Sequence, residues 1–365
     1  MSNNLKETIE DLTQEGVLYK TLPDKKDFIE CFACAHRCKI KLGSSGICKV
    51  RYNKNNQLFV PWGYVAAWQC DPIEKKPFYH AYPGSLAMSF GMLGCDFHCG
   101  FCQNWLTSQT LRNPSAGVSP RIISSDDFID KAIQYNARVV TSTYNEPLIT
   151  SEWAVEIFKK AKNNNFATSY VSNGNATPEV LDYIRPFTDL YKIDLKSFQD
   201  KNYRSMGGTL EAVLRSIKDV YKRGMWLEIV TLIIPGFNDS DEELAEIASF
   251  IANISIDIPW HVTGFHKDYK MIDPEDTPSE TLIKAVEIGR ENGLNYVYPG
   301  NRPGMVGDYE NTYCPNCQQL LVMRHGHSIK KYKITNDSKC FACSTKIAGV
   351  WESPKGRIRD FPIPI

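Results

Sequence analysis

The sequence contains twelve cysteines that fall into three groups, and this grouping limits what the chain can fold around more than any other feature. Four cysteines lie within residues 31–48, three within 95–102 and four within 314–343, which leaves Cys70 alone. Scattered core cysteines do not cluster in this way, and clustered thiols in a reducing compartment are more often metal ligands than disulfide partners. The pattern therefore predicts a protein that binds metal.

Composition and charge exclude several classes of protein. The 365 residues include 42 basic and 42 acidic side chains, which gives a formal net charge of zero. A nucleic-acid or membrane-surface binder would show a basic excess, so neither partner is expected. No apolar stretch approaches the roughly 20 residues of a membrane-spanning helix, and the polar segment 1–16 does not resemble a signal peptide. We therefore expect a cytoplasmic protein.

The chain divides into three regions of different texture. Residues 1–85 are rich in loops, aromatic side chains and cysteines, and they are predicted to form an N-terminal extension. Residues 86–304 alternate short apolar runs with helix-like segments and are predicted to form the core domain. Residues 305–365 contain the last cysteines, a basic stretch and a proline-rich tail, and they are predicted to form a zinc-ribbon-like segment.

The core domain is predicted to consist of repeated strand–helix units. Its candidate strands are 86–92, 137–143, 166–172, 189–195, 225–234, 260–266 and 294–298. Its candidate helices are 126–136, 151–163, 209–223, 241–254 and 278–292. Strands separated by whole helices pair in parallel. The fold class is therefore α/β, either a partial or full (β/α) barrel or a doubly wound sheet.

Polar clusters follow nearly every predicted strand. In order they are Cys95–Cys102, Asn145–Pro147, Ser172–Gly174, Asp194–Lys196, Pro235–Gly236 and His266. In parallel α/β folds the functional site lies at the carboxyl ends of the strands. We therefore expect these clusters to meet at one mouth.

The central cysteines have the spacing C-x3-C-x2-C. A structural zinc ion needs four ligands, and His98 is the only local residue that could join Cys95, Cys99 and Cys102. A zinc knuckle completed by His98 is therefore one interpretation. Three thiolates alone suit a [4Fe–4S] cluster in which one iron stays open to a small molecule. The spacing after a first strand favours the cluster.

At this point the chain resembles the radical S-adenosylmethionine (SAM) superfamily, which implies a partial (β/α)6-type barrel with cysteine-rich extensions at both ends. Asn145 and Glu146 resemble a Gly-Gly-Glu-Pro-like motif whose polar groups receive the SAM ammonium, with Asn145 in place of a glycine. Ser172 and Asn173 resemble the Asp-Thr-Asn-Gly motif of glycyl-radical-enzyme activases, near the SAM ribose, with Ser172 in place of an aspartate.

Two further motifs extend this resemblance. Asp194-Leu195-Lys196 is similar to the Asp-Leu-Lys motif of the activases, in which the lysine approaches the SAM carboxylate. His266 resembles a late-strand histidine of the same group that also lines the SAM site. Cleavage of SAM requires no obligatory general acid or base, so we assign no catalytic side chain.

A narrower resemblance covers about residues 31–351. The run Asp-Pro-Ile-Glu-Lys-Lys-Pro at 71–77, the segment 94–105 and the segment 265–271 are similar to radical SAM proteins of the AmmeMemoRadiSam system, which are related to pyruvate formate-lyase activating enzymes. The resemblance implies Memo-type and AMMECR-type partner proteins and an electron donor such as flavodoxin or ferredoxin.

The resemblance does not supply the substrate, so three functions stay open. The first is hydrogen abstraction from a small molecule or a peptide by a 5′-deoxyadenosyl radical. The second is installation of a glycyl radical on a partner protein. The third, from a different class, is a non-catalytic metal-ribbon binding protein. The zero net charge and the complete set of SAM motifs count against this third function.

The outer cysteine groups are also candidate metal sites. The C-terminal group has zinc-ribbon spacing and consists of Cys314, Cys317, Cys340 and Cys343; zinc is favoured over an auxiliary iron–sulfur cluster. The N-terminal group is less regular and consists of Cys31, Cys34, Cys38 and Cys48. Either zinc or a second cluster fits it, and His36 could replace one cysteine. The basic stretch 324–333 is expected to be a solvated hairpin face on an appendage that need not share the SAM mouth.

Overall fold

The computed structural model describes residues 2–113, 115–354 and 363–364. Its largest sheet has nine strands in the order β16-β15-β14-β13-β12-β11-β9-β8-β20. All neighbours from β9 to β16 pair in parallel, whereas β8 and β20 are antiparallel. These strands are β8 (Ala67–Pro72), β9 (Leu86–Gly91), β11 (Val139–Ser142), β12 (Ala167–Ser172), β13 (Leu190–Asp194), β14 (Trp226–Ile233), β15 (Trp260–Gly264), β16 (Val297–Gly300) and β20 (Ile363–Pro364).

Helices connect the parallel strands, so each unit is the strand–helix repeat that the sequence predicts. The main helices are α3 (Ser125–Gln134), α4 (Ser151–Asn163), α5 (Pro178–Ile184), α7 (Leu210–Lys222), α8 (Asp241–Ala252) and α9 (Ser279–Glu291). Ser124 and Ser240 cap α3 and α8 by accepting a hydrogen bond from a backbone N–H, as expected for serine before acidic residues. Because β16 and β9 lie apart in the strand order, the barrel is partial and the predicted fold class is confirmed.

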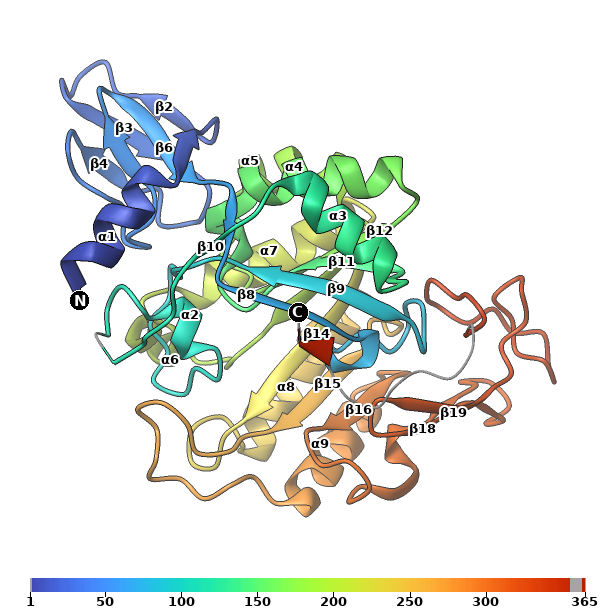
Figure 1. Ribbon diagram of the computed structural model, residues 1–365. Helices are drawn as coiled ribbons and strands as arrows, with labels where there is room; N and C mark the ends of the chain where they lie inside the picture. Colours follow the sequence, from blue (N-terminus) through green and yellow to red (C-terminus); the bar gives the residue numbers. More distant parts are fainter. Residues whose placement is uncertain (1, 114, 355–362, 365) are drawn as a thin grey trace.

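The N-terminal region forms small sheets at one end of the molecule (Figure 1). It contains α1 (Ser2–Asp11), β1 (Thr13–Glu15), β2 (Tyr19–Thr21), β3 (Phe28–Cys31), β4 (Lys39–Lys41), β5 (Tyr52–Lys54), β6 (Gln57–Pro61) and β7 (Tyr64–Val65), which pairs with β10 (Arg121–Ile122). Arg51 anchors this region: its side chain is 1% exposed and forms an ion pair with Glu152 of α4 at 2.7 Å. The nine-stranded sheet itself extends across residue 85, because β8 pairs with β9.

Short helices complete the core. They are η1 (Ile73–Lys75), α2 (Trp105–Ser108), η2 (Pro147–Thr150), η3 (Arg185–Phe187), α6 (Asp200–Met206) and η4 (Gly307–Glu310). Apolar side chains from the helices and strands merge into one large buried cluster. Within the described ranges, none of the helices has both the length and the apolar character needed to span a bilayer.

The C-terminal region contains the hairpin β18 (Leu320–His325) and β19 (Ser328–Tyr332), with β17 (Thr312–Tyr313) beside it (Figure 1). The prediction that the basic stretch is entirely solvated is wrong for Arg324, which is 4% exposed. Its guanidinium donates hydrogen bonds to Tyr79 O at 2.8 Å and Thr312 Oγ1 at 2.7 Å. Residues alternate between the two faces of a strand, and Arg324 lies on the face of β18 that packs against the barrel.

Candidate active site

A cavity of about 420 Å³ lies at the carboxyl ends of the parallel strands. The predicted ligands Cys95, Cys99 and Cys102 line it from the loop that follows β9. Six more of the predicted residues line it from the ends of β11, β12 and β13: Asn145, Glu146, Ser172, Asn173, Asp194 and Lys196. The structure thus brings together side chains that are far apart in the sequence, as expected for the carboxyl edge of a parallel sheet.

The loop that carries the three cysteines rests against the end of α6. Gly207 follows this helix with φ of 90°, in the left-handed region that favours glycine. A Cβ atom at Gly207 would lie 2.6 Å from the His98 ring, and one at Gly208 would lie 2.4 Å from the Phe97 ring. The exposed His98 ring therefore packs against α6, which disfavours the zinc knuckle that His98 would complete.

The spacing and surroundings of the three thiols fit a cluster better than a single ion. Four thiolates on one zinc ion lie about 3.8 Å apart, because the Zn–S bond is about 2.3 Å long. Among the described residues, these thiols do not form a group with all ligand atoms within 4.8 Å of one another. Burial raises the pKa of the Cys99 thiol to about 12, so loading the site with metal displaces protons. Phe97 N donates to Cys95 Sγ at 3.3 Å, and Ser108 Oγ lies 3.1 Å from Cys102 Sγ.

The carboxylate of Glu146 forms part of the cavity wall and is 2% exposed. Its Oε1 accepts hydrogen bonds from Ser172 Oγ at 2.8 Å and Leu148 N at 3.0 Å, and its Oε2 accepts one from Asn173 N at 2.8 Å. Burial and the neighbouring Asp96 raise the pKa of Glu146 to about 8. A cationic group that enters the cavity would favour the ionised form of Glu146, whose position is already fixed by these three donors.

Asp96 is a buried residue of the site that the sequence analysis did not identify. Its carboxylate accepts hydrogen bonds from Asn173 Nδ2 at 2.7 Å and Asn175 Nδ2 at 2.8 Å, so these two side chains hold the cysteine loop against the end of β12. A buried acid needs such partners. One sequence feature could have indicated a role for Asp96. Asn173 and Asn175, two residues apart, directly follow a predicted strand and can both donate hydrogen bonds to a buried acid.

Asp194 lies between two lysines. Lys192 Nζ is 2.5 Å from Asp194 Oδ1, and Lys196 Nζ is 3.0 Å from Asp194 Oδ2. Burial opposes ionisation of Asp194, but Lys192 and Lys196 hold its pKa below the usual value. Lys192 also lines the cavity and was not predicted, although the two-residue period of a strand puts it on the same face as Asp194. One carboxylate shared by two ammonium groups leaves positive charge at this wall.

The remaining predicted residues differ in position. Asn145 Oδ1 accepts a hydrogen bond from Met92 N at 3.1 Å, which ties the end of β11 to that of β9. His266 is exposed, and its Nδ1 lies 3.3 Å from Lys267 O. β15 ends at Gly264, and Thr263 lines the cavity on that side. The structure therefore does not bring His266 into the cavity wall, and its contact with SAM stays a prediction.

The C-terminal cysteines form a compact group. The sulfur atoms of Cys314 and Cys343 are 3.6 Å apart, as are those of Cys317 and Cys340, and all four lie within 4.8 Å of one another. These separations are close to the about 3.8 Å expected for four thiolates on one tetrahedral ion. Hydrogen bonds from Thr345 and from Cys317 lower the pKa of Cys343 to about 6. The geometry of this group therefore suits one tetrahedral metal ion.

The N-terminal cysteines are close together but less compact. Burial, Asp96 and the charges of Cys31, Cys38 and Cys48 all raise the pKa of Cys34. Arg51 Nε donates a hydrogen bond to Cys31 Sγ at 3.2 Å. Within the part of the chain that the structure describes, no three ligand atoms of this group lie within 4.8 Å of one another. This spacing is wider than that of the C-terminal group.

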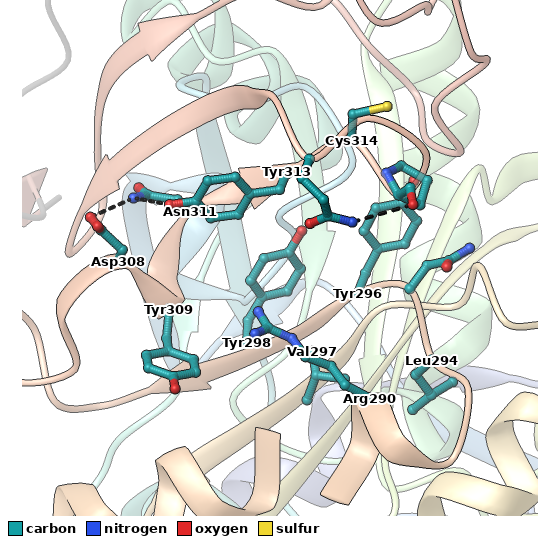
Figure 2. A pocket seen from close by; sticks show the side chains of 13 residues that line it. Arg290, Leu294, Tyr296, Val297, Tyr298, Asp308, Tyr309, Asn311, Tyr313 and Cys314 are labelled. Atoms are coloured by element: carbon teal, nitrogen blue, oxygen red, sulfur yellow. Dashed lines mark hydrogen bonds between the residues drawn. The ribbon is translucent and has the colours of Figure 1, made fainter. Parts of the chain in front are cut away.

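A second cavity, of about 560 Å³, lies at the amino end of β16 (Figure 2). Figure 2 shows its aromatic lining, which comprises Tyr296, Tyr298, Tyr309 and Tyr313. Arg290 lies over the Tyr309 ring at 5.3 Å, and Cys314 borders the cavity. Among the described residues, none of the predicted SAM contacts lines this second cavity. The cavity at the carboxyl ends of the strands is therefore the candidate active site.

Comparisons with known proteins show what the chain is similar to. The family described as the Radical SAM superfamily matches residues 91–251. An uncharacterized protein of Methanocaldococcus jannaschii is 36% identical over 337 residues, which cover 92% of this chain and 98% of that protein. A pyruvate formate-lyase-activating enzyme of Staphylococcus epidermidis is 25% identical over 227 residues, which cover 55% of this chain and 87% of that protein. A radical SAM methyltransferase structure from Sphaerobacter thermophilus aligns with 85% of this chain and 81% of its own, with a TM-score of 0.46 and 14% identity.

Proposed function

We propose that the chain is a radical SAM enzyme that cleaves SAM reductively at a [4Fe–4S] cluster to generate a 5′-deoxyadenosyl radical, because residues 91–251 match the Radical SAM superfamily. The radical then abstracts hydrogen from a small-molecule or peptide substrate. One observation carries this proposal: Cys95, Cys99 and Cys102 line the same cavity as Glu146 and Lys196. The three thiols can ligate a cluster. The carboxylate of Glu146 and the ammonium group of Lys196 can pair with the amino and carboxylate groups of SAM.

Different residues of the cavity are proposed to bind the cluster and SAM. Cys95, Cys99 and Cys102 would hold the cluster through three thiolates. When bound, the cluster supplies the electron that breaks the S–C5′ bond of SAM. Glu146 accepts a charge-assisted hydrogen bond from the SAM ammonium group, and Lys196 donates one to the SAM carboxylate. We also assign Asn145, Ser172, Asn173, Asp194 and His266 to this site; His266 is exposed and does not line the cavity.

Partner proteins form part of the proposal. A small redox protein such as flavodoxin or ferredoxin is the proposed electron donor, and the reducing cytoplasm is the proposed location. Membership of the AmmeMemoRadiSam group, with Memo-type and AMMECR-type partners, rests on the sequence resemblance alone. A second candidate function is installation of a glycyl radical on a partner protein, which the similarity to pyruvate formate-lyase-activating enzymes favours.

The outer cysteine groups are proposed to bind metal for structure or electron transfer. The 3.6 Å sulfur separations favour zinc at the C-terminal group over an auxiliary cluster. The wider spacing of the N-terminal group favours a second iron–sulfur cluster over zinc. On this basis we propose an N-terminal metal-binding extension (1–85), a SAM-binding core (86–304) and a C-terminal zinc-ribbon segment (305–365).

The test is SAM cleavage by the anaerobically reconstituted protein with dithionite as reductant. We expect 5′-deoxyadenosine and methionine from the wild type, and neither product from Cys95→Ala, Cys99→Ala or Cys102→Ala, because the C-x3-C-x2-C segment contains no spare cysteine. Cys70→Ala is the matched control, since Cys70 is buried but lies outside the three groups. Full cleavage by the Cys99→Ala protein would refute the proposal.

A further inference from the structure

The active-site cavity has a second charged end that the SAM residues do not use. Asp71, Lys75, Lys76, Tyr144 and His327 all line the cavity. Asp71 closes β8, the two lysines follow it, and Tyr144 precedes the Asn145–Glu146 motif. His327 comes from the turn between β18 and β19, so the C-terminal segment reaches the cavity although its four cysteines do not line it. The C-terminal segment therefore contributes His327 to the lining of the cavity.

Hydrogen bonds fix the positions of these charged groups. Lys76 Nζ donates to Asp71 Oδ2 at 2.7 Å, and Lys75 Nζ lies 3.1 Å from Asp71 Oδ1. Tyr144 OH donates to Asp71 Oδ2 at 2.8 Å. The backbone of Tyr144 has φ of 66°, and a Cβ atom at Gly91 would lie 2.7 Å from the Tyr144 Cβ. The glycine thus permits the close approach that aims Tyr144 at Asp71.

Among the side chains that line this end, ammonium groups outnumber carboxylates; the Glu310 carboxylate lies outside the lining but acts electrostatically on His327. One carboxylate, Asp71, faces two ammonium groups, and the Lys76 side chain is only 4% exposed. Burial lowers the pKa of Lys76 to about 8, although Asp71 favours its charged form. The buried Lys76 is paired with Asp71, whereas the Lys75 ammonium is 38% exposed and shares the same carboxylate, so its charge is available to a further anion. The group is therefore suited to receive one more negative charge.

SAM does not supply this second negative charge. The proposed site for the single SAM carboxylate is Lys196, which together with Lys192 shares Asp194. The cavity thus contains two similar arrangements, each with two lysines and one aspartate, and SAM satisfies one of them. Lys75 is 38% exposed and His327 is exposed, so both are accessible from solvent.

We propose that Lys75, Lys76 and His327 form the substrate-binding end of the cavity and that this end binds an oxyanion of the substrate, either a carboxylate or a phosphate group. The inference rests on the proposed function and names the chemical class of its substrate. Tyr144 connects the two ends, because its hydroxyl group contacts Asp71 while Glu146, two residues later, faces the SAM site. The oxyanion thus fixes the substrate beside bound SAM.

The test uses the full-length reconstituted protein with SAM present, titrated calorimetrically with malonate and separately with inorganic phosphate. We expect at least one anion to bind the wild type and to bind Lys75→Met at least tenfold more weakly. Lys75 is changed because removal of the buried Lys76 risks unfolding the protein. His327→Gln provides a second variant from another region of the chain, and it should also weaken binding. Lys162→Met is the matched control, because Lys162 also pairs with an aspartate, Asp189, and is 33% exposed away from the cavity.

The outcomes separate this inference from the proposed function. Tighter binding of malonate identifies a carboxylate, and tighter binding of phosphate identifies a phosphate; both results support the oxyanion site. Absence of binding to the wild type, or equal binding to the wild type, Lys75→Met and His327→Gln, overturns it. A Lys75→Met protein that loses SAM affinity but keeps its anion affinity also overturns it, because Lys75 would then serve SAM. SAM cleavage by the wild type in the same preparation tests the proposed function independently.

Discussion

Replacement of Glu146 tests the assignment of the SAM site most directly. The carboxylate is buried and already held by three donors, from Ser172, Leu148 and Asn173. A hydrogen bond that involves a charged group contributes about 1.5–3 kcal/mol, and its loss should weaken SAM binding roughly tenfold to 150-fold. Glu146→Gln removes the charge and preserves the side-chain volume. Glu146→Ala also leaves the three donors without a partner, so it should weaken binding further.

The assay is anaerobic calorimetric titration with SAM, performed on proteins whose iron content has been matched. Glu243→Gln is the control variant, because Glu243 is also a buried carboxylate with hydrogen-bond donors around it. It accepts a hydrogen bond from the Ser197 hydroxyl group at 2.5 Å and one from Phe198 N at 2.6 Å. It lies at the start of α8, outside the cavity lining. Wild-type SAM affinity in Glu146→Gln, with the cluster intact, would remove Glu146 from the SAM site.

Three further predictions follow from particular side chains. Lys196→Ala should weaken SAM binding at least tenfold with unchanged iron content, by the same calorimetric measurement, and unchanged affinity would contradict its role. Cys317→Ser/Cys343→Ser should lose one zinc ion by elemental analysis while the soluble protein still cleaves SAM; loss of about four irons would instead show a cluster. Burial raises the pKa of Glu74 to about 7, so the folded state holds this proton more tightly than the unfolded state. The free energy of unfolding should therefore fall by up to about 1.4 kcal/mol per pH unit between pH 5 and pH 7, and Glu74→Gln should remove that slope in denaturant titrations.

The parallel core could be predicted well because its signals are local. Apolar runs and the strand–helix period predict α4 at 151–163, the same bounds as observed. The strand predicted at 294–298 instead begins at Val297. The chain first closes the end of α9, where Leu294 N donates to Gly289 O at 3.1 Å and Gly293 takes φ of 94°. Boundaries of this kind depend on how a helix ends, which apolar periodicity does not reveal.

The convergence of most predicted motifs on one cavity could also be predicted, but the charged end of that cavity could not. Glu146 and Lys196 follow strands of a regular repeat, so the topology alone places them together. Asp71, by contrast, enters the sheet on the antiparallel strand β8, and His327 lies more than half of the chain away from it. Only tertiary packing joins them. The same reason explains Arg324, whose burial depends on contacts with Tyr79.

The C-terminal segment is held in place by the core of the barrel, and this arrangement connects its group of four cysteines to the end of the cavity that His327 lines. His80 Nδ1 lies 2.7 Å from Ala348 O and His80 Nε2 lies 2.6 Å from Tyr298 OH, while His80 N donates to the buried Glu228. These contacts join the chain after the last cysteine to β14 and β16. The hairpin that carries His327 is thus fixed by the barrel on one side and by the cysteine group on the other. The residues proposed to bind SAM follow strands of the parallel sheet and do not depend on the hairpin or on the cysteine group for their positions. Disruption of the cysteine group should therefore weaken oxyanion binding more than SAM binding.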